Sequence, residues 1–221
     1  MNVRFGATHP GDDPGHILDG AAMPKTIDYF FTPVSPWTYL GHDRLLAIAA
    51  KHGAAIAPKL VDLGKVFPIS GGLPLPKRAP QRQAYRLTEL ARWRDYLGVP
   101  INFQPKFGAA SGDPGCRWIL AARERGAQPA LALAGAIMRA RWAEERDIAD
   151  EATLAAIAAA LGQDAEALAA RAATPEIAAA YEADTQEAID RQVFGAPTYV
   201  YRDEPFWGQD RLDFVDRKLA Q

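Results

Sequence analysis

The residues best suited to chemistry lie in the segment Ser35-Pro36-Trp37-Thr38. A serine followed by a proline is typical of a helix start, where the serine caps the first turn and the proline occupies it. Unpaired backbone N–H groups and the positive end of the helix dipole meet there, so the position favours an anion beside the Ser35 hydroxyl. Capping alone also explains the pattern, so both interpretations stay open at this point.

A second set of candidates is basic. Lys77 and Arg78 precede Arg82 and Arg86, which are four residues apart and would share one face of a helix. One member of this group could bind a carboxylate of a ligand. The group could equally be a solvated basic face.

The composition excludes several kinds of site. Cys116 is the single cysteine among 221 residues, so an intramolecular disulfide and a cysteine-based metal cluster are impossible, and we expect a cytoplasmic protein. Cys116 is expected to open a helix after Gly115, where its thiol could be mildly acidic, but a lone cysteine is more typical of a structural or incidental role. His42 and His52 have no third ligand at metal spacing. The net charge of −2 and the absence of a long apolar run give no indication of a nucleic-acid or membrane partner.

The elements that must position these residues follow from periodicity and from glycine and proline positions. The pattern predicts, in chain order, a strand at 26–31, a helix at 35–52 that Gly53 ends, a strand at 55–61, a loop at 64–79, a helix at 81–98, an irregular stretch at 99–115, helices through 116–192, a strand at 196–201, a short strand starting at 206 and a last helix from 210. In the first helix, Trp37, Gly41, Leu45 and Ile48 would form the face that packs on a sheet.

This order of elements, β-α-β followed much later by α-β-β-α, predicts an α/β thioredoxin-like fold with a large all-helical insertion. Residues 24–63 and 193–221 would form the thioredoxin-like domain. Residues 64–192 would form the helical insertion, with its last helix belonging to the thioredoxin-like part. Residues 1–23 are interpreted as a disordered extension, or as a misassigned start that precedes the true beginning at Met23.

Thioredoxin-like folds normally carry Cys-x-x-Cys at the start of the first helix, where the dipole lowers a thiol pKa. Here Ser35 and Thr38 occupy both cysteine positions, so disulfide exchange at this site is excluded. A thiolate supplied by a ligand would be stabilised there instead.

Three segments in the right order resemble the 2-hydroxychromene-2-carboxylate isomerases and the related kappa-class glutathione transferases. The resemblance covers residues 25–220 and depends on the opening Tyr29–Gly41, on Pro80–Tyr85 followed by Glu89 and Trp93, and on Phe194–Thr198 followed by Phe206–Leu212. Many relatives have a lysine where Arg82 stands.

The resemblance implies glutathione as the cofactor. Ser35 would hold its sulfur as a thiolate, and Pro197 would follow a cis peptide bond. The backbone of Ala196 would pair with the cysteinyl part, and Gln209 and Asp210, at the start of the last helix, would hold the γ-glutamyl end. Capping is the alternative role for Asp210. Arg82 is a further candidate for cofactor binding.

Trp37, Lys77 and Arg86 are the candidates for binding a small-molecule substrate, and Tyr39 and Trp207 could complete an aromatic wall. The helical insertion would cover the active end of the thioredoxin-like part and leave an apolar cleft between them. The implied activity is the interconversion of 2-hydroxychromene-2-carboxylate and trans-o-hydroxybenzylidenepyruvate, with glutathione as a nucleophilic catalyst that is not consumed. A kappa-like glutathione transferase or peroxidase and a cysteine-less DsbA-like binding module are the alternatives. We also expect a homodimer.

Overall fold

A mixed four-stranded sheet lies at the centre of the computed structural model, which describes residues 24–108 and 111–221. The strands are β1 (Thr26–Phe31), β2 (Ala55–Leu60), β3 (Thr198–Tyr201) and β4 (Glu204–Trp207), and their order in the sheet is β2-β1-β3-β4. β1 pairs in parallel with β2, whereas β3 is antiparallel to both β1 and β4. The predicted thioredoxin-like fold is therefore confirmed. The interpretation of residues 1–23 lies outside the described residues.

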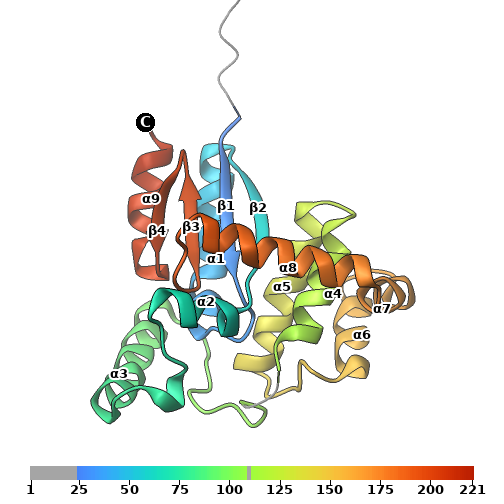
Figure 1. Cartoon of the computed structure of the whole chain (residues 1–221), viewed down its shortest axis with the longest axis horizontal. Helices are drawn as coiled ribbons and strands as arrows, with labels where there is room; N and C mark the ends of the chain where they lie inside the picture. Colours follow the sequence, from blue (N-terminus) through green and yellow to red (C-terminus); the bar gives the residue numbers. More distant parts are fainter. Residues whose placement is uncertain (1–23, 109–110) are drawn as a thin grey trace, which may run out of the picture.

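The helices largely occupy the part of the chain between β2 and β3 (Figure 1). They are α1 (Pro36–His52), α2 (Leu63–Ser70), α3 (Pro80–Leu97), α4 (Asp113–Arg123), α5 (Ala127–Trp142), α6 (Glu151–Ala160), α7 (Ala165–Ala172), α8 (Pro175–Asp190) and α9 (Leu212–Leu219), with 3-10 turns η1 (Leu75–Lys77) and η2 (Gln209–Arg211). The large helical insertion is thus present. None of the helices in the described ranges combines the length and the apolar character needed to cross a membrane.

Both faces of the central strand β1 are covered, so its consecutive aromatic residues Tyr29, Phe30 and Phe31 are all buried, whereas Asp28 pairs with Arg191 at 2.6 Å. Tyr29 and Phe31 join the larger core, which includes Leu45 of α1 and Leu212 of α9. Phe30 points to the opposite face and packs in a smaller cluster that includes Val66, Ala188, Val193 and Val200. Helix α1 therefore lies against one face of the sheet and α8 and α2 against the other.

Several predicted boundaries were wrong, and the largest error concerns residues 64–79. This stretch contains α2 and η1, because the Asp62 side chain caps α2 by accepting a hydrogen bond from the Gly64 N–H at 2.7 Å and Val66 anchors the helix in the core. Pro68 lies inside α2. A proline there forgoes only one helical hydrogen bond, which packing of so short a helix can offset.

The other corrections are smaller. Helix α4 begins at Asp113, not Cys116, and a non-helical segment separates α5 from α6. β3 begins at Thr198, after the cis Ala196–Pro197 bond. β4 begins at Glu204, not at 206, because the two-residue turn Arg202-Asp203 adopts positive φ angles and aligns Tyr201 with Glu204.

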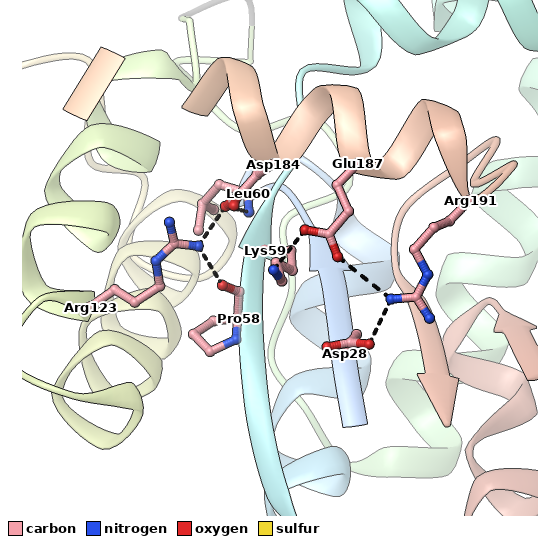
Figure 2. Close-up of polar contacts among 8 residues, drawn as sticks. All are labelled: Asp28, Pro58, Lys59, Leu60, Arg123, Asp184, Glu187 and Arg191. Carbon is pink, nitrogen blue, oxygen red and sulfur yellow. Dashed lines mark hydrogen bonds and ion pairs between the residues drawn. The ribbon is translucent and has the colours of Figure 1, made fainter. Parts of the chain in front are cut away.

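Polar contacts fix α4 and α8 to the edge strand β2 (Figure 2). Asp184 of α8, whose side chain is 7 % exposed, accepts hydrogen bonds from the Leu60 N–H at 2.9 Å and from the Arg123 guanidinium of α4 at 2.6 Å. The same Arg123 nitrogen donates to the Pro58 carbonyl at 2.8 Å. Near the end of α8, Glu187 accepts from Lys59 at 2.7 Å. The insertion is therefore attached to the sheet through an edge that would otherwise be open.

Candidate functional site

Ser35 is the N-cap of α1 and is nearly buried, with 7 % of its surface exposed. Its Oγ accepts a hydrogen bond from the Thr38 N–H at 3.3 Å, as capping requires. The same hydroxyl donates to the Ala196 carbonyl oxygen at 3.0 Å, across 161 residues of sequence. Capping therefore uses the acceptor side of the hydroxyl only, and its proton is directed at the loop that precedes β3.

The Ala196–Pro197 peptide bond is cis, as the resemblance implied. The Pro197 carbonyl accepts a hydrogen bond from the Gly208 N–H at 2.9 Å, and the Thr198 hydroxyl donates to the Gly195 carbonyl at 2.7 Å. The first bond connects the loop before β3 to the turn after β4, and the second lies within the loop itself. The structure thus brings Ser35, Ala196 and Pro197 together from distant parts of the chain.

Gln209 and Asp210 lie in the 3-10 turn η2, and α9 itself begins only at Leu212. The prediction that they open the last helix is corrected accordingly. Gln209 is 2 % exposed, and its Nε2 has no hydrogen-bond partner among the described residues. Asp210 is partly exposed and pairs with Arg211 at 2.9 Å. Neither side chain caps a helix.

Arg44 is a site residue that the sequence did not reveal. Its guanidinium donates to Gln209 Oε1 at 2.8 Å, to the Gln209 carbonyl at 3.2 Å and to the Asp213 carboxylate at 3.2 Å. It also lies over the Trp93 ring, 5.9 Å from the ring centre. Arg44 therefore joins α1 to η2, α9 and α3. No local pattern could have found it, because Gln209 follows 165 residues later.

The four basic residues at 77–86 divide into three neighbouring arginines and one exposed lysine. Arg82 is exposed and Arg86 half-buried on α3, and Arg78 precedes that helix. Burial lowers the pKa of Arg86, and the charge of Arg78 lowers it further. The pKa of Arg78 is lowered by burial and by the charge of Arg82. The three arginines are thus electrostatic neighbours, whereas Lys77 is exposed.

The aromatic candidates have different environments. Trp37 is half-buried and packs against the larger core. Tyr39 is 8 % exposed and donates a hydrogen bond to the Pro100 carbonyl at 2.9 Å. Trp207 is 53 % exposed, packs on Phe194 with 4.8 Å between ring centres and lies close to Gly195. Trp207 therefore forms an open apolar wall beside the Ala196 loop.

A cavity of about 830 Å³ lies between the sheet-bearing part and the helical insertion. Its walls come from α1, α5, the end of α6 and the segment after α3, and they include Tyr39, Arg44, Val99, Leu131 and Ile157. Ser35 is not part of the lining. The cleft predicted over the active end thus begins one helical turn farther along α1, at Tyr39.

Two other candidates from the sequence have structural roles. Cys116 is buried inside α4, and burial raises the pKa of its thiol to about 12, which contradicts a mildly acidic thiol and agrees with the structural role. His42 is also buried, its Nε2 lies 3.1 Å from the Leu131 carbonyl oxygen, and burial lowers its pKa. In the described part of the chain, no group of three His, Cys, Asp or Glu side chains could hold a metal ion.

The comparisons with known proteins agree with this geometry. The family model for the DSBA-like thioredoxin domain matches residues 26–220. The chain is 31 % identical over 198 residues to a 2-hydroxychromene-2-carboxylate isomerase of Sphingobium xenophagum, covering 89 % of this chain and 99 % of that protein. It is 23 % identical over 212 residues to human glutathione S-transferase kappa 1, covering 90 % of this chain and 92 % of that protein.

Among solved structures, a 2-hydroxychromene-2-carboxylate isomerase superposes with a TM-score of 0.76 at 28 % sequence identity, and the match covers 88 % of this chain and 94 % of that chain. Two Pseudomonas proteins of the same name are 27 % and 28 % identical to the chain. The fold, the family model and the named relatives therefore agree, and the chain belongs to the 2-hydroxychromene-2-carboxylate isomerase family of DsbA-like thioredoxin-domain proteins.

Proposed function

We propose that the protein is a glutathione-dependent isomerase that interconverts 2-hydroxychromene-2-carboxylate and trans-o-hydroxybenzylidenepyruvate, or a close analogue. The observation that carries the proposal is Ser35, a nearly buried hydroxyl at a helix N-terminus that faces the cis-proline loop. This position normally belongs to a cysteine in the fold, and here the thiolate would come from a ligand. The names of the relatives support the reaction.

The residues fit glutathione. Gln209 offers a buried amide N–H that has no acceptor among the described residues, which suits a carboxylate of the ligand. Asp210 offers a carboxylate, only partly shielded by Arg211, to the ammonium group of the γ-glutamyl end. Glutathione supplies a thiolate nucleophile when bound, and the related human kappa-class protein is named for its use of glutathione.

The chain's own residues would act by charge and position. Ser35 would turn its hydroxyl proton from the Ala196 carbonyl to the ligand sulfur and so favour the thiolate over the thiol. The N–H groups of the first turn of α1 and the helix dipole would add to this stabilisation. Trp207 would cover the conjugated ring system, and arginines near the start of α3 would hold carboxylates.

The decisive experiment follows both isomers by ultraviolet absorbance and free thiol by titration. We expect interconversion only when glutathione is present, with the thiol concentration unchanged at equilibrium. Turnover without glutathione would contradict the proposed role of the cofactor.

The Asp210→Asn variant should bind glutathione more weakly in calorimetry while its melting temperature stays close to that of the wild type, and unchanged affinity would place the γ-glutamyl end elsewhere.

A kappa-like glutathione transferase is the second candidate, because the human relative spans nearly the whole chain. That enzyme class consumes its thiol. Stoichiometric loss of thiol with an electrophilic aromatic substrate, without isomerisation of the chromene carboxylate, would favour it.

Whether the chain forms a homodimer, as we propose, can be measured by sedimentation at micromolar concentration.

A further inference from the structure

The segment that contains α2, η1 and the start of α3 is unusually one-sided in charge. Between Asp62 and Glu89 the chain has no acidic residue. The same segment contains the cations Lys65, Lys77, Arg78, Arg82 and Arg86. Ion pairs to acidic side chains are frequent elsewhere in the molecule, so this stretch depends on more distant residues, or on a ligand, for neutralisation.

The structure supplies a distant partner for Lys65 but not for the arginines. Lys65 pairs with Glu182 of α8. Glu89, the first acidic residue after the segment, pairs with Arg92. Within residues 24–108 and 111–221, no carboxylate lies within ion-pair distance of Arg78, Arg82 or Arg86.

The three arginines lie within one segment, where the charge of Arg78 lowers the pKa of Arg86 and the charge of Arg82 lowers the pKa of Arg78. Arg82 and Arg86 are four residues apart on α3 and therefore share a face. The Arg78 Nε donates to the Leu73 carbonyl at 2.7 Å, and the Arg78 carbonyl accepts from Gln83 at 2.8 Å, so the preceding loop is fastened to the first turns of the helix. Arg78 and Arg86 are both half-buried.

Such an arrangement is unfavourable in the absence of a counterion. Like charges at this spacing repel, and a half-buried guanidinium loses part of its hydration without a carboxylate to replace it. Interactions that oppose folding are typical of binding sites, where a ligand relieves them. Planar guanidinium groups bind carboxylates through two parallel hydrogen bonds, so the ligand chemistry that fits is a carboxylate.

We propose that Arg78, Arg82 and Arg86 form one anion site that binds two carboxylates at once. The resemblance already makes Arg82 the candidate for a carboxylate of glutathione. The new assignment is that Arg86, supported by Arg78, would hold the carboxylate of the substrate. Arg86 would then determine the preference for carboxylate-bearing substrates, and Lys77 would have no part in it. This assignment rests on the proposed function for the identity of both ligands, but the anion site itself does not.

The location of α3 agrees with this assignment. Figure 1 shows α3 beyond the end of the sheet at which β1 stops. Ser35 lies at that same end, because it follows β1 directly and opens α1. Arg44 of α1 stacks on Trp93 of α3, which ties the two helices together. Cofactor and substrate carboxylates would therefore meet at the end of the molecule that holds the reactive thiol.

The anion site can be tested without any assumption about the reaction. Thermal unfolding is followed for the wild type, Arg86→Met and Arg92→Met, with succinate as the probe and sodium chloride at equal ionic strength as the reference. Methionine keeps the apolar stem of the arginine side chain, and Arg92, which provides the control, is an exposed, paired arginine on the same helix.

We expect Arg86→Met to melt no lower than the wild type without succinate. Succinate should raise the melting temperature of the wild type and of Arg92→Met, but not of Arg86→Met. A lower melting temperature for Arg86→Met together with no effect of succinate on the wild type would overturn the proposal.

The division between the two carboxylates is tested by kinetics and calorimetry. Arg86→Met should raise KM for the chromene carboxylate about tenfold to a hundredfold, the usual effect of losing a charge-assisted hydrogen bond, and leave the glutathione Kd unchanged. Arg82→Met should weaken glutathione binding instead, and Arg86→Lys should restore part of the lost affinity. An active wild type whose KM is unaffected by Arg86→Met would overturn the assignment. An inactive wild type that still responds to succinate through Arg86 would refute the proposed function and keep the anion site.

Discussion

At the scale of single residues, the two hydrogen bonds of Ser35 can be separated experimentally. Ser35→Ala removes the helix cap, which should cost about 1 kcal/mol of stability, and it also removes the proposed bond to the thiolate. We expect the glutathione-dependent rate to fall about tenfold to a hundredfold, as for the loss of one charge-assisted hydrogen bond. Thr174→Ala is a matched control, because Thr174 caps α8 with its hydroxyl. It should lose similar stability and no activity, and equal activity in both variants would reduce Ser35 to a cap.

Cys116 gives a second prediction at this scale. Its thiol is fully buried in α4, and burial raises its pKa to about 12, so at pH 8 the native protein should contain almost no thiolate. Ellman's reagent should therefore react with no thiol in the folded protein and with one per chain in guanidinium chloride. Cys116→Ala should retain glutathione-dependent activity. Rapid modification of the native protein, or loss of activity in a folded Cys116→Ala variant, would make the cysteine a functional residue.

At the scale of elements, the close approach of α1 to the η2 turn depends on Gly41. A methyl group at this position would lie 2.7 Å from Gln209 Cβ and 2.8 Å from the Tyr199 hydroxyl oxygen. Alanine normally stabilises a helix interior by up to about 1 kcal/mol relative to glycine, but overpacking here should cost about 1–3 kcal/mol. We expect Gly41→Ala to lower the free energy of unfolding and to weaken glutathione binding by displacing Gln209. Ala50→Gly, exposed on the same helix, calibrates the propensity effect, and a stabilised Gly41→Ala protein with normal affinity would contradict the prediction.

What the sequence could predict at this scale depended on the range of the interactions. The bounds of α1 were predictable because Ser35-Pro36 and Gly53 act on their own neighbours. Helix α2 was missed because glycine and proline dominate the local composition, while its stability comes from burial of Val66 against distant residues. The site divides in the same way. Ser35 carries a local signal, whereas the bond from Arg44 to Gln209 exists only once the chain has folded.

At the scale of the whole molecule, the contact between the helical insertion and the sheet depends on the pair Arg123 and Asp184. Burial raises the pKa of Asp184 although Arg123 lies against it, so the charged carboxylate gains less from its partner than it loses in hydration. In such a pair each member mainly serves to neutralise the other. Removing either side chain leaves the other as a poorly hydrated charge. Removing Asp184 also leaves the Leu60 N–H without its hydrogen-bond partner.

Asp184→Leu and Arg123→Met should therefore each destabilise the protein, by about 3 kcal/mol for the aspartate, which is the usual effect of breaking a buried ion pair. The double variant Arg123→Met/Asp184→Leu should lose clearly less than the sum of the single losses, because it contains no unpaired charge. Urea unfolding of the four proteins completes the double-mutant cycle. Additive losses would show that the two side chains act independently. Coupled losses, with glutathione binding retained in the double variant, would show that the insertion needs a neutral contact at β2 and not the ion pair itself.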